Sequence, residues 1–358
     1  MTFAANFSLI EQRDLLNSAL AEFSSQECRY LREIGPELEA VASAMHSFIC
    51  DSGKRLRPIF AYVGYLGTGA HPDEAVIKAS AALELIHVCA LMHDDVMDGS
   101  DSRRGAPSIH RAFEAFHKRD GAEGSAAQFG INSAILLGDL ALVWSAKMLH
   151  QSGVESSALL RALPMYDEMR VELMAGQYLD IYESTLASQS VERSLKVARF
   201  KSGKYTIERP LHFGASLGTS NSDELMKIYS AYGLPLGEAF QLRDDVLGVF
   251  GNPSETGKPA GDDLREGKRT VLLATTFDRV SDAQRAIMEE HIGNPSISSD
   301  AVEEIRSIIV NTDALAEVED LISSLTNSAL EAVDSDRVAE PARKALIDLA
   351  AIVTKRNT

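Results

Sequence analysis

Helical periodicity runs through almost the whole chain and limits its fold more than any other feature. Between residues 74 and 98, apolar side chains recur every three or four positions, which places them on one face of an α-helix. Similar patterns cover 9–34, 131–149, 159–182, 191–217, 223–250, 270–278, 283–291 and 301–355, the last with a break near Pro341. Alternating strand patterns and paired β-turn signals do not stand out. The sequence therefore predicts an all-α fold, a large bundle of long helices.

Polar or glycine-containing breaks separate these helical patterns. The segment 51–58 is charged, 99–105 is polar, and 115–130 is rich in glycine, alanine and charge, so we expect a flexible connection there. Residues 251–267 combine glycine, proline and charge, and form the longest predicted structureless stretch, a length often found in functional loops. No shift in composition divides the 358 residues, so we expect a single domain, 1–358.

The bulk composition excludes some kinds of partner. Lys and Arg number 35 and Asp and Glu 52, so the net charge is −17, which argues against nonspecific binding of nucleic acid or anionic membrane over the whole surface. The three cysteines, Cys28, Cys50 and Cys89, form no disulfide framework and no metal-site spacing, which favours a reducing cytoplasm. The most apolar stretch, 131–149, contains Asp139 and Lys147, so we do not expect a membrane span.

The first of two acidic clusters ends an apolar helix. It reads Asp94-Asp95-Val96-Met97-Asp98 and is followed by Arg103 and Arg104. In a helix, Asp94 and Asp98 project from one face. Carboxylates this close repel one another unless a cation compensates them, and oxygen-only ligands suit Mg²⁺. Because the residues before the acids are apolar, a metal site is favoured over a solvated helix end.

The second acidic cluster, Asp244-Asp245 within the helical segment 237–247, is shorter. Position 248 is glycine, so a third acid at the spacing of the first cluster is missing. Taken alone, such a pair is more often surface charge than a metal ligand. Cations recur beside glycine or proline breaks, however, at Lys54, Arg55, Arg57, Arg103, Arg104, Lys201, Lys204, Lys258 and Lys268. Guanidinium and ammonium groups suit phosphate oxygens, so the combination predicts a diphosphate held through magnesium.

The order of these segments resembles the trans-isoprenyl diphosphate synthases, the polyprenyl synthases that elongate prenyl chains head to tail. The motifs are GKRLRP (53–58), DDVMDGSDSRRG (94–105), GQYLD (176–180), KSG (201–203), QLRDDVLGVFG (241–251) and TGKPAGDDLREGKRT (256–270). The resemblance implies the isoprenoid synthase fold, in which helices surround a central cavity. It also implies a homodimer that condenses isopentenyl diphosphate with allylic diphosphates.

The resemblance also implies roles for individual residues. Asp94 and Asp98 would bind two Mg²⁺ ions with support from Asp95, and Asp244 a third, with Asp245 and Asp263 behind it. The allylic diphosphate would be held by Arg103, Lys201, Lys258 and Lys268. The diphosphate of isopentenyl diphosphate would be held by Lys54, Arg57, His87 and Arg104. The allylic cation or the metal shell would be ordered by Gln177, Asp180, Ser202 and Gln241, where Ser202 stands in place of the threonine of many relatives.

Two features leave alternatives open. His87 lies between Leu83 and Leu91 on the predicted helix, so it is either a core histidine or, the reading we favour, a substrate contact on the approach to the acids. Cys89 and Ala90 are small and lie about one turn before Asp94, so they should not stop a growing chain early. The chain would then stop deeper, at Trp144 or Met148, which could equally be core packing, or at Ile86 and Leu85. We therefore expect mainly the C20 product, geranylgeranyl diphosphate.

Three other classes of protein fit the motifs less well. A class I terpene cyclase would carry an Asn/Ser/Glu metal triad in place of Asp244 and Asp245, and it would not need Lys54 and Arg57. A non-catalytic partner subunit of a synthase tends to lose acids of the first cluster, which is complete here. A plain helical binding protein leaves the order of the motifs unexplained.

Overall fold

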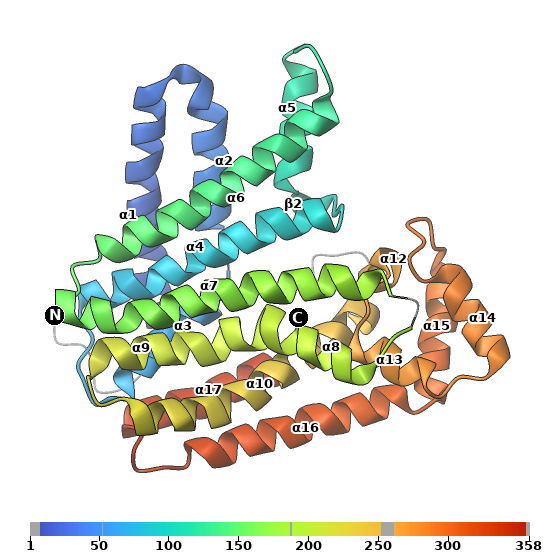
Figure 1. Ribbon diagram of the computed structural model, residues 1–358. Coiled ribbons are helices and arrows are strands. Elements are labelled where there is room, and N and C mark those ends of the chain that lie inside the picture. Colours follow the sequence, from blue (N-terminus) through green and yellow to red (C-terminus); the bar gives the residue numbers. More distant parts are fainter. Residues whose placement is uncertain (1–7, 52, 187, 252–260, 356–358) are drawn as a thin grey trace. The chain divides into compact units, whose positions relative to one another are not determined.

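The computed structural model describes residues 8–51, 53–186, 188–251 and 261–355, and these are almost entirely helical (Figure 1). The all-α prediction is confirmed. Contacts divide the chain into two compact units: Met1–Ala162 with Gly214–Ser220, and Leu163–Phe213 with Asn221–Thr358. Helices α7 (Ser156–Ser184) and α9 (Arg209–Gly218) each begin in one unit and end in the other. That the whole chain acts as one domain stays a prediction.

The first unit is built around α4. Its elements are α1 (Leu9–Ile34), η1 (Pro36–Leu38), α2 (Glu39–Cys50), α3 (Leu56–Leu66), α4 (Glu74–Met97), β1 (Ser102–Arg103), β2 (Ala106–Pro107), α5 (Ile109–Arg119) and α6 (Ala126–His150). Helix α4 packs against α1, α3 and α6, and most of its residues are buried because they are small or apolar on nearly every side. The Ser145 hydroxyl of α6 donates to the Ala82 carbonyl of α4 at 2.6 Å.

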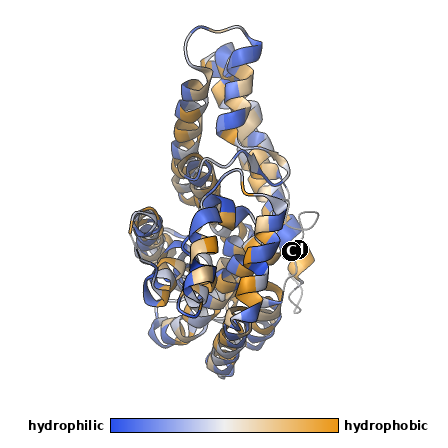
Figure 2. Ribbon diagram, turned by 90° about the vertical axis from the view of Figure 1, so that its right-hand side faces the viewer, coloured by the Kyte–Doolittle hydropathy of each residue, from blue (hydrophilic) through white to orange (hydrophobic). Residues whose placement is uncertain are grey.

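Two described helices, α4 and α6, are long and apolar enough to cross a membrane. In α4 the apolar window is 72% buried inside the protein, as in the core helix of a globular unit. In α6 the share is 33%, because one face of α6 packs on α4 and α5 while Ile135, Leu136 and Val143 are exposed. Figure 2 shows the more common pattern, in which hydrophobic and hydrophilic residues share the same helix.

The second unit is built around α10. It contains α8 (Val191–Val197), η2 (Ala198–Glu208), α10 (Asp223–Phe250), α12 (Asp262–Glu266), α13 (Val271–Phe277), α14 (Asp282–His291), α15 (Ser299–Asn311), α16 (Ala314–Val333) and α17 (Glu340–Thr354). Helix α10 packs along α16 and η2 and also contacts α12, α13 and α17. Leu242, Val246 and Val249 of α10 join Leu264 and residues of α13, α15 and α16 in one apolar core. Element η2 is a π-helix, a wide helix that occurs often at functional sites.

The structure corrects several sequence-based boundaries. The flexible connection predicted at 115–130 is wrong, because α5 continues to Arg119 and α6 begins at Ala126. Gly130 lies inside α6, where a Cβ would come within 2.1 Å of the His110 carbonyl oxygen, so this glycine serves close helix packing. Part of the predicted structureless stretch 251–267 is helix α12, and 191–217 is interrupted by the π-helix. Helices α2 and α3 were not predicted, because their apolar patterns are short.

Candidate functional site

The first acidic cluster occupies the last turn of α4. Asp94 and Asp98 are half-buried there, and the Asp98 amide donates to the Asp94 carbonyl at 2.8 Å as the helix ends. The C-terminal end of a helix carries partial negative charge from its last carbonyls. Carboxylates at this end are therefore unfavourable unless cations accompany them, which fits a site that binds hard metal ions.

A short hairpin brings Arg103 to this cluster. Strands β1 and β2 pair antiparallel, and the turn between them contains Arg104 and Gly105, both with positive φ (55° and 78°). Arg103 Nε donates to the buried Asp95 Oδ1 at 2.8 Å, and the same guanidinium lies 3.7 Å from Asp94 Oδ2. Asp95 therefore orients the arginine, and Asp94 lies beside the same guanidinium.

The three cations of the motif at 53–58 have different surroundings. Arg55 is buried, with an ion pair to Glu84 at 2.8 Å, and it also donates to Asn17 Oδ1 at 2.9 Å and to the Ile49 carbonyl at 2.7 Å. It therefore ties α3 to α1, α2 and α4. Lys54 is exposed and Arg57 is buried. The partner of Arg55 was missed by sequence reasoning, although a glutamate inside the apolar α4 pattern is a signal for a buried ion pair.

His87 lies on α4 among arginines. Burial lowers its pKa well below the ordinary value, and the positive charges of Arg57, Arg104 and Arg103 lower it further. The ring is therefore neutral at physiological pH and offers hydrogen bonds without charge. Arg104 lies over the Phe48 ring, 5.8 Å from its centroid, and 3.9 Å from Asp51 Oδ2. The positive charges that act on His87 are suited to an anion.

In the second unit, close helix packing places the GQYLD and KSG segments together. A Cβ on Gly176 of α7 would lie 2.3 Å from the Lys201 nitrogen, and one on Gly237 of α10 would lie 2.4 Å from Gly203 Cα. Backbones therefore meet directly where η2 crosses α7 and α10. The Lys201 ammonium pairs with Asp180 Oδ2 at 2.6 Å. Gln177 and Ser202 are half-buried on the same segments.

The second acidic cluster has unequal members. Asp244 is half-buried, whereas Asp245 is buried and accepts a hydrogen bond from Gln241 Nε2 at 2.8 Å. Burial raises the pKa of Asp245 to about 8, and the charges of Asp263 and Asp244 contribute. Arg243, between Leu242 and Asp244, bonds to Glu319 at 2.6 Å and to the Thr354 carbonyl at 2.8 Å. It therefore connects α10 to α16 and α17.

The glycine at 248 is explained by Asp263. A Cβ on Gly248 would lie 1.9 Å from Asp263 Oδ2 and 2.4 Å from its Cγ. The carboxylate of Asp263, which comes from α12, thus fills the space that a side chain at 248 would need. Lys268 Nζ lies 2.7 Å from Glu266 Oε2 and 3.7 Å from Asp263 Oδ1. The predicted phosphate ligand Lys258 lies outside the described residues.

The predicted chain-length residues Cys89 and Ala90 differ in their surroundings on α4. Cys89 is fully buried, and burial raises the pKa of its thiol to about 12. Its sulfur is 3.8 Å from His93 Nδ1, and His93 Nε2 is 3.0 Å from the Ile135 carbonyl of α6. Ala90 is half-buried. Trp144 packs edge-on against Phe23, with ring centroids 6.2 Å apart, as expected for core packing.

The donor chemistry of both clusters fits magnesium. Within the described ranges, no group of three or more acidic, imidazole or thiol side chains is already gathered as a complete metal cage. Mg²⁺ is commonly held by one or two carboxylates together with substrate phosphates, so half-buried aspartates beside cations suit it. The predicted residues fall into two sets. The first unit holds Lys54, Arg57, His87, Asp94, Asp95, Asp98, Arg103 and Arg104, and the second holds Gln177, Asp180, Lys201, Ser202, Gln241, Asp244, Asp245, Asp263 and Lys268.

Comparisons with known proteins point to the family that the sequence motifs resemble. The chain is similar to a crystal structure of geranylgeranyl pyrophosphate synthase from Corynebacterium glutamicum complexed with isoprenyl diphosphate and magnesium. The TM-score is 0.94 and the identity 41%, over 98% of this chain and 100% of that one. A geranylfarnesyl diphosphate synthase of Aeropyrum pernix is 33% identical, over 77% of this chain and 81% of its own length. A geranylgeranyl diphosphate synthase of Sulfolobus acidocaldarius is 28% identical, over 77% and 78%. The polyprenyl synthetase family model matches residues 38–309, so the chain belongs to this family of trans-prenyltransferases.

Proposed function

We propose that the protein condenses isopentenyl diphosphate head to tail with allylic diphosphates and forms mainly geranylgeranyl diphosphate. One recurring observation supports this function: each unit holds a cation in place with a motif carboxylate. Asp95 bonds Arg103 in the first unit, and Asp180 bonds Lys201 in the second. Cations fixed in this way are preorganised for phosphate oxygens.

The proposed roles of the site residues follow from their charge. Asp94, Asp98 and Asp244 would hold magnesium, about three ions by family resemblance. Bound ions would neutralise the diphosphate that leaves as the allylic carbon–oxygen bond breaks. Arg103, Lys201 and Lys268 hold the oxygens of that diphosphate. Lys54, Arg57, Arg104 and neutral His87 hold the diphosphate of the second substrate. Gln177, Ser202 and Gln241 offer neutral dipoles, so they can face a carbocation without adding positive charge.

The proposed preference for a C20 product rests on the small residues of α4 that precede the acids, and we call these residues the wall. Cys89 and Ala90 are small, so a chain of three isoprene units can pass them. The Corynebacterium relative carries the C20 product in its name, whereas the Aeropyrum relative is named for a longer one. Family membership therefore does not fix the product length, and we assign it to the side chains that precede the acids on α4.

The test is an elongation assay. Purified protein, Mg²⁺ and labelled isopentenyl diphosphate are incubated with C5, C10 or C15 allylic diphosphate, and product length is measured. We expect a C20 product, and no elongation with any starter would reject the function. Ala90→Phe or Cys89→Phe should shorten the product, whereas unchanged C20 output from both variants would reject this account of the wall.

We also propose a cytoplasmic homodimer without a membrane span. Exposed apolar residues on α6, at Ile135, Leu136 and Val143, support a partner surface. So do the exposed residues of α7 at heptad-like spacing, Val171, Met174, Tyr178 and Ile181. The three cysteines are free thiols, as expected in a reducing compartment. Sedimentation velocity at micromolar concentration should give a species of twice the chain mass, and a purely monomeric species would contradict the dimer.

A further inference from the structure

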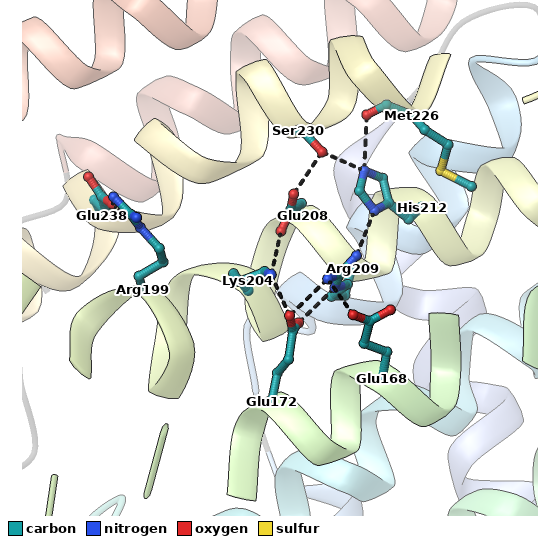
Figure 3. A network of polar contacts seen from close by, with 10 residues as sticks. All are labelled: Glu168, Glu172, Arg199, Lys204, Glu208, Arg209, His212, Met226, Ser230 and Glu238. Carbon is teal, nitrogen blue, oxygen red and sulfur yellow. Dashed lines mark hydrogen bonds and ion pairs between the residues drawn. The ribbon is translucent and has the colours of Figure 1, made fainter. Parts of the chain in front are cut away.

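A largely buried network of charged side chains in the second unit includes Lys204, three residues after Lys201 on η2 (Figure 3). Lys204 of η2 forms an ion pair with Glu172 of α7 and lies 3.8 Å from Glu208. Arg209 bonds to Glu172 at 2.7 Å and to Glu168 at 3.2 Å. The Ser230 hydroxyl of α10 donates to Glu208 at 2.7 Å and lies 3.1 Å from His212.

The burial of this network makes stability a poor explanation for it. The side chains of Glu172, Lys204 and Arg209 are 11%, 13% and 11% exposed, and Glu208 is 5% exposed. Removing charges from water is so unfavourable that apolar replacements of similar volume are often at least as stable. The best-attested use of a buried ion pair is to fix which of several packing registers a segment adopts.

The network and the predicted diphosphate ligands share the same two segments in a matched order. Glu172, Gly176 and Asp180 are four residues apart on α7, so they line one face. Along that face they meet, in turn, the Lys204 ammonium, the Lys201 backbone and the Lys201 ammonium. A π-helix has an extra residue in each hydrogen-bonded turn, so its side chains do not follow the regular α-helical register. Something outside the helix must therefore fix its orientation.

We propose that Glu172 and Lys204 are positioning residues for Lys201 and Ser202. Their ion pair sets the register of η2 on α7, and the register aims the Lys201 ammonium and the Ser202 hydroxyl at the allylic diphosphate. This inference rests on the proposed function, because that function assigns Lys201 to the allylic substrate.

The test compares charge removal inside and outside the network. Glu172→Gln and Lys204→Met each remove one charge while almost preserving shape. Glu238→Gln is the matched control, because Glu238 pairs with Arg199 of the same π-helix at 2.6 Å and tethers it to α10 instead of α7. We expect the first two variants to raise KM for the allylic diphosphate about five-fold, with KM for isopentenyl diphosphate unchanged. The control and Lys204→Arg should keep both KM values near those of the wild type.

A second measurement separates this inference from the proposed function. Hydrogen–deuterium exchange should become faster across 201–204 in Glu172→Gln and Lys204→Met, but not in Glu238→Gln, and circular dichroism should confirm folded protein. If both network variants keep the wild-type allylic KM and exchange rates, the positioning role is wrong even if their melting temperatures fall. If the wild type elongates no substrate, the proposed function fails, and exchange alone decides whether the ion pair fixes the π-helix.

Discussion

The two acidic regions reach a similar chemistry by different routes. In the first unit, Asp94, Asp95 and the C-cap residue Asp98 lie at the end of α4, and a hairpin a few residues later supplies Arg103. In the second unit, carboxylates come from α10 and α12, and Lys268, which follows α12, lies 3.7 Å from Asp263 Oδ1. The first region is specified by local sequence, whereas the second depends on how helices pack. The first should therefore lose function mainly through its own residues, and the second also through residues that touch no substrate.

The largest expected effect concerns the first acidic cluster, where loss of one aspartate should lower activity more than in the second. Asp94→Asn should lower kcat/KM about 1,000-fold, because a ligand for a charge-stabilising metal is worth several kcal/mol. Asp244→Asn should lower it less, about 100-fold, because Asp245 and Asp263 remain nearby. Steady-state kinetics at saturating Mg²⁺ measures both. Asp101→Asn, which removes an exposed partner of Arg111, is the control. Equal losses at positions 94 and 244 would remove the contrast between the regions.

A second prediction concerns the helix contact that replaces the third acid. Gly248→Ala should destabilise the protein by about 2 kcal/mol, because the new methyl group meets the Asp263 carboxylate. Replacing a helical glycine by alanine usually stabilises a helix, so the sign is distinctive. Urea unfolding of Gly248→Ala, with and without Asp263→Ala, measures the coupling. If the destabilisation is the same in both backgrounds, Asp263 does not occupy that space.

The smallest expected effect, taken per pH unit, is on the pH dependence of folding stability. Burial and the charge of Arg209 lower the pKa of His212 to about 4, from an ordinary value of 6.5. As pH falls from 6.5 towards 4, His212 becomes protonated in the unfolded chain but stays neutral in the folded protein. The free energy of unfolding therefore falls. The loss from His212 should be about 1.4 kcal/mol for each pH unit in this window. His212→Gln should flatten the stability profile there. A residual slope is expected from His87, whose pKa is lowered in the same direction.

The sequence predicted much of the fold and the first acidic region, because both depend on short-range spacing. Helix α1 and helix α10 match their predicted ranges, and Asp94 and Asp98 follow from one helical turn. The π-helix was not predictable, because an apolar pattern does not distinguish hydrogen bonds four residues apart from those five apart. The contact between Asp263 and Gly248 was not predictable, because the two residues lie on different helices and no helical spacing relates them. The pairing of Arg55 with Glu84 was not predictable either, because the two residues lie 29 positions apart in the sequence.

The direct meeting of backbones at Gly176, Gly203 and Gly237 has a consequence for heat adaptation. Replacing glycine by alanine is a standard route to higher melting temperature, because alanine restricts the unfolded chain. A methyl group at Gly176 or Gly237 would come within 2.5 Å of a neighbouring backbone atom, and one at Gly203 would lie 3.0 Å from Gly237. Replacing these three glycines by alanine should therefore not raise the melting temperature. Variants of this enzyme selected at rising temperature should accumulate changes elsewhere and keep all three glycines.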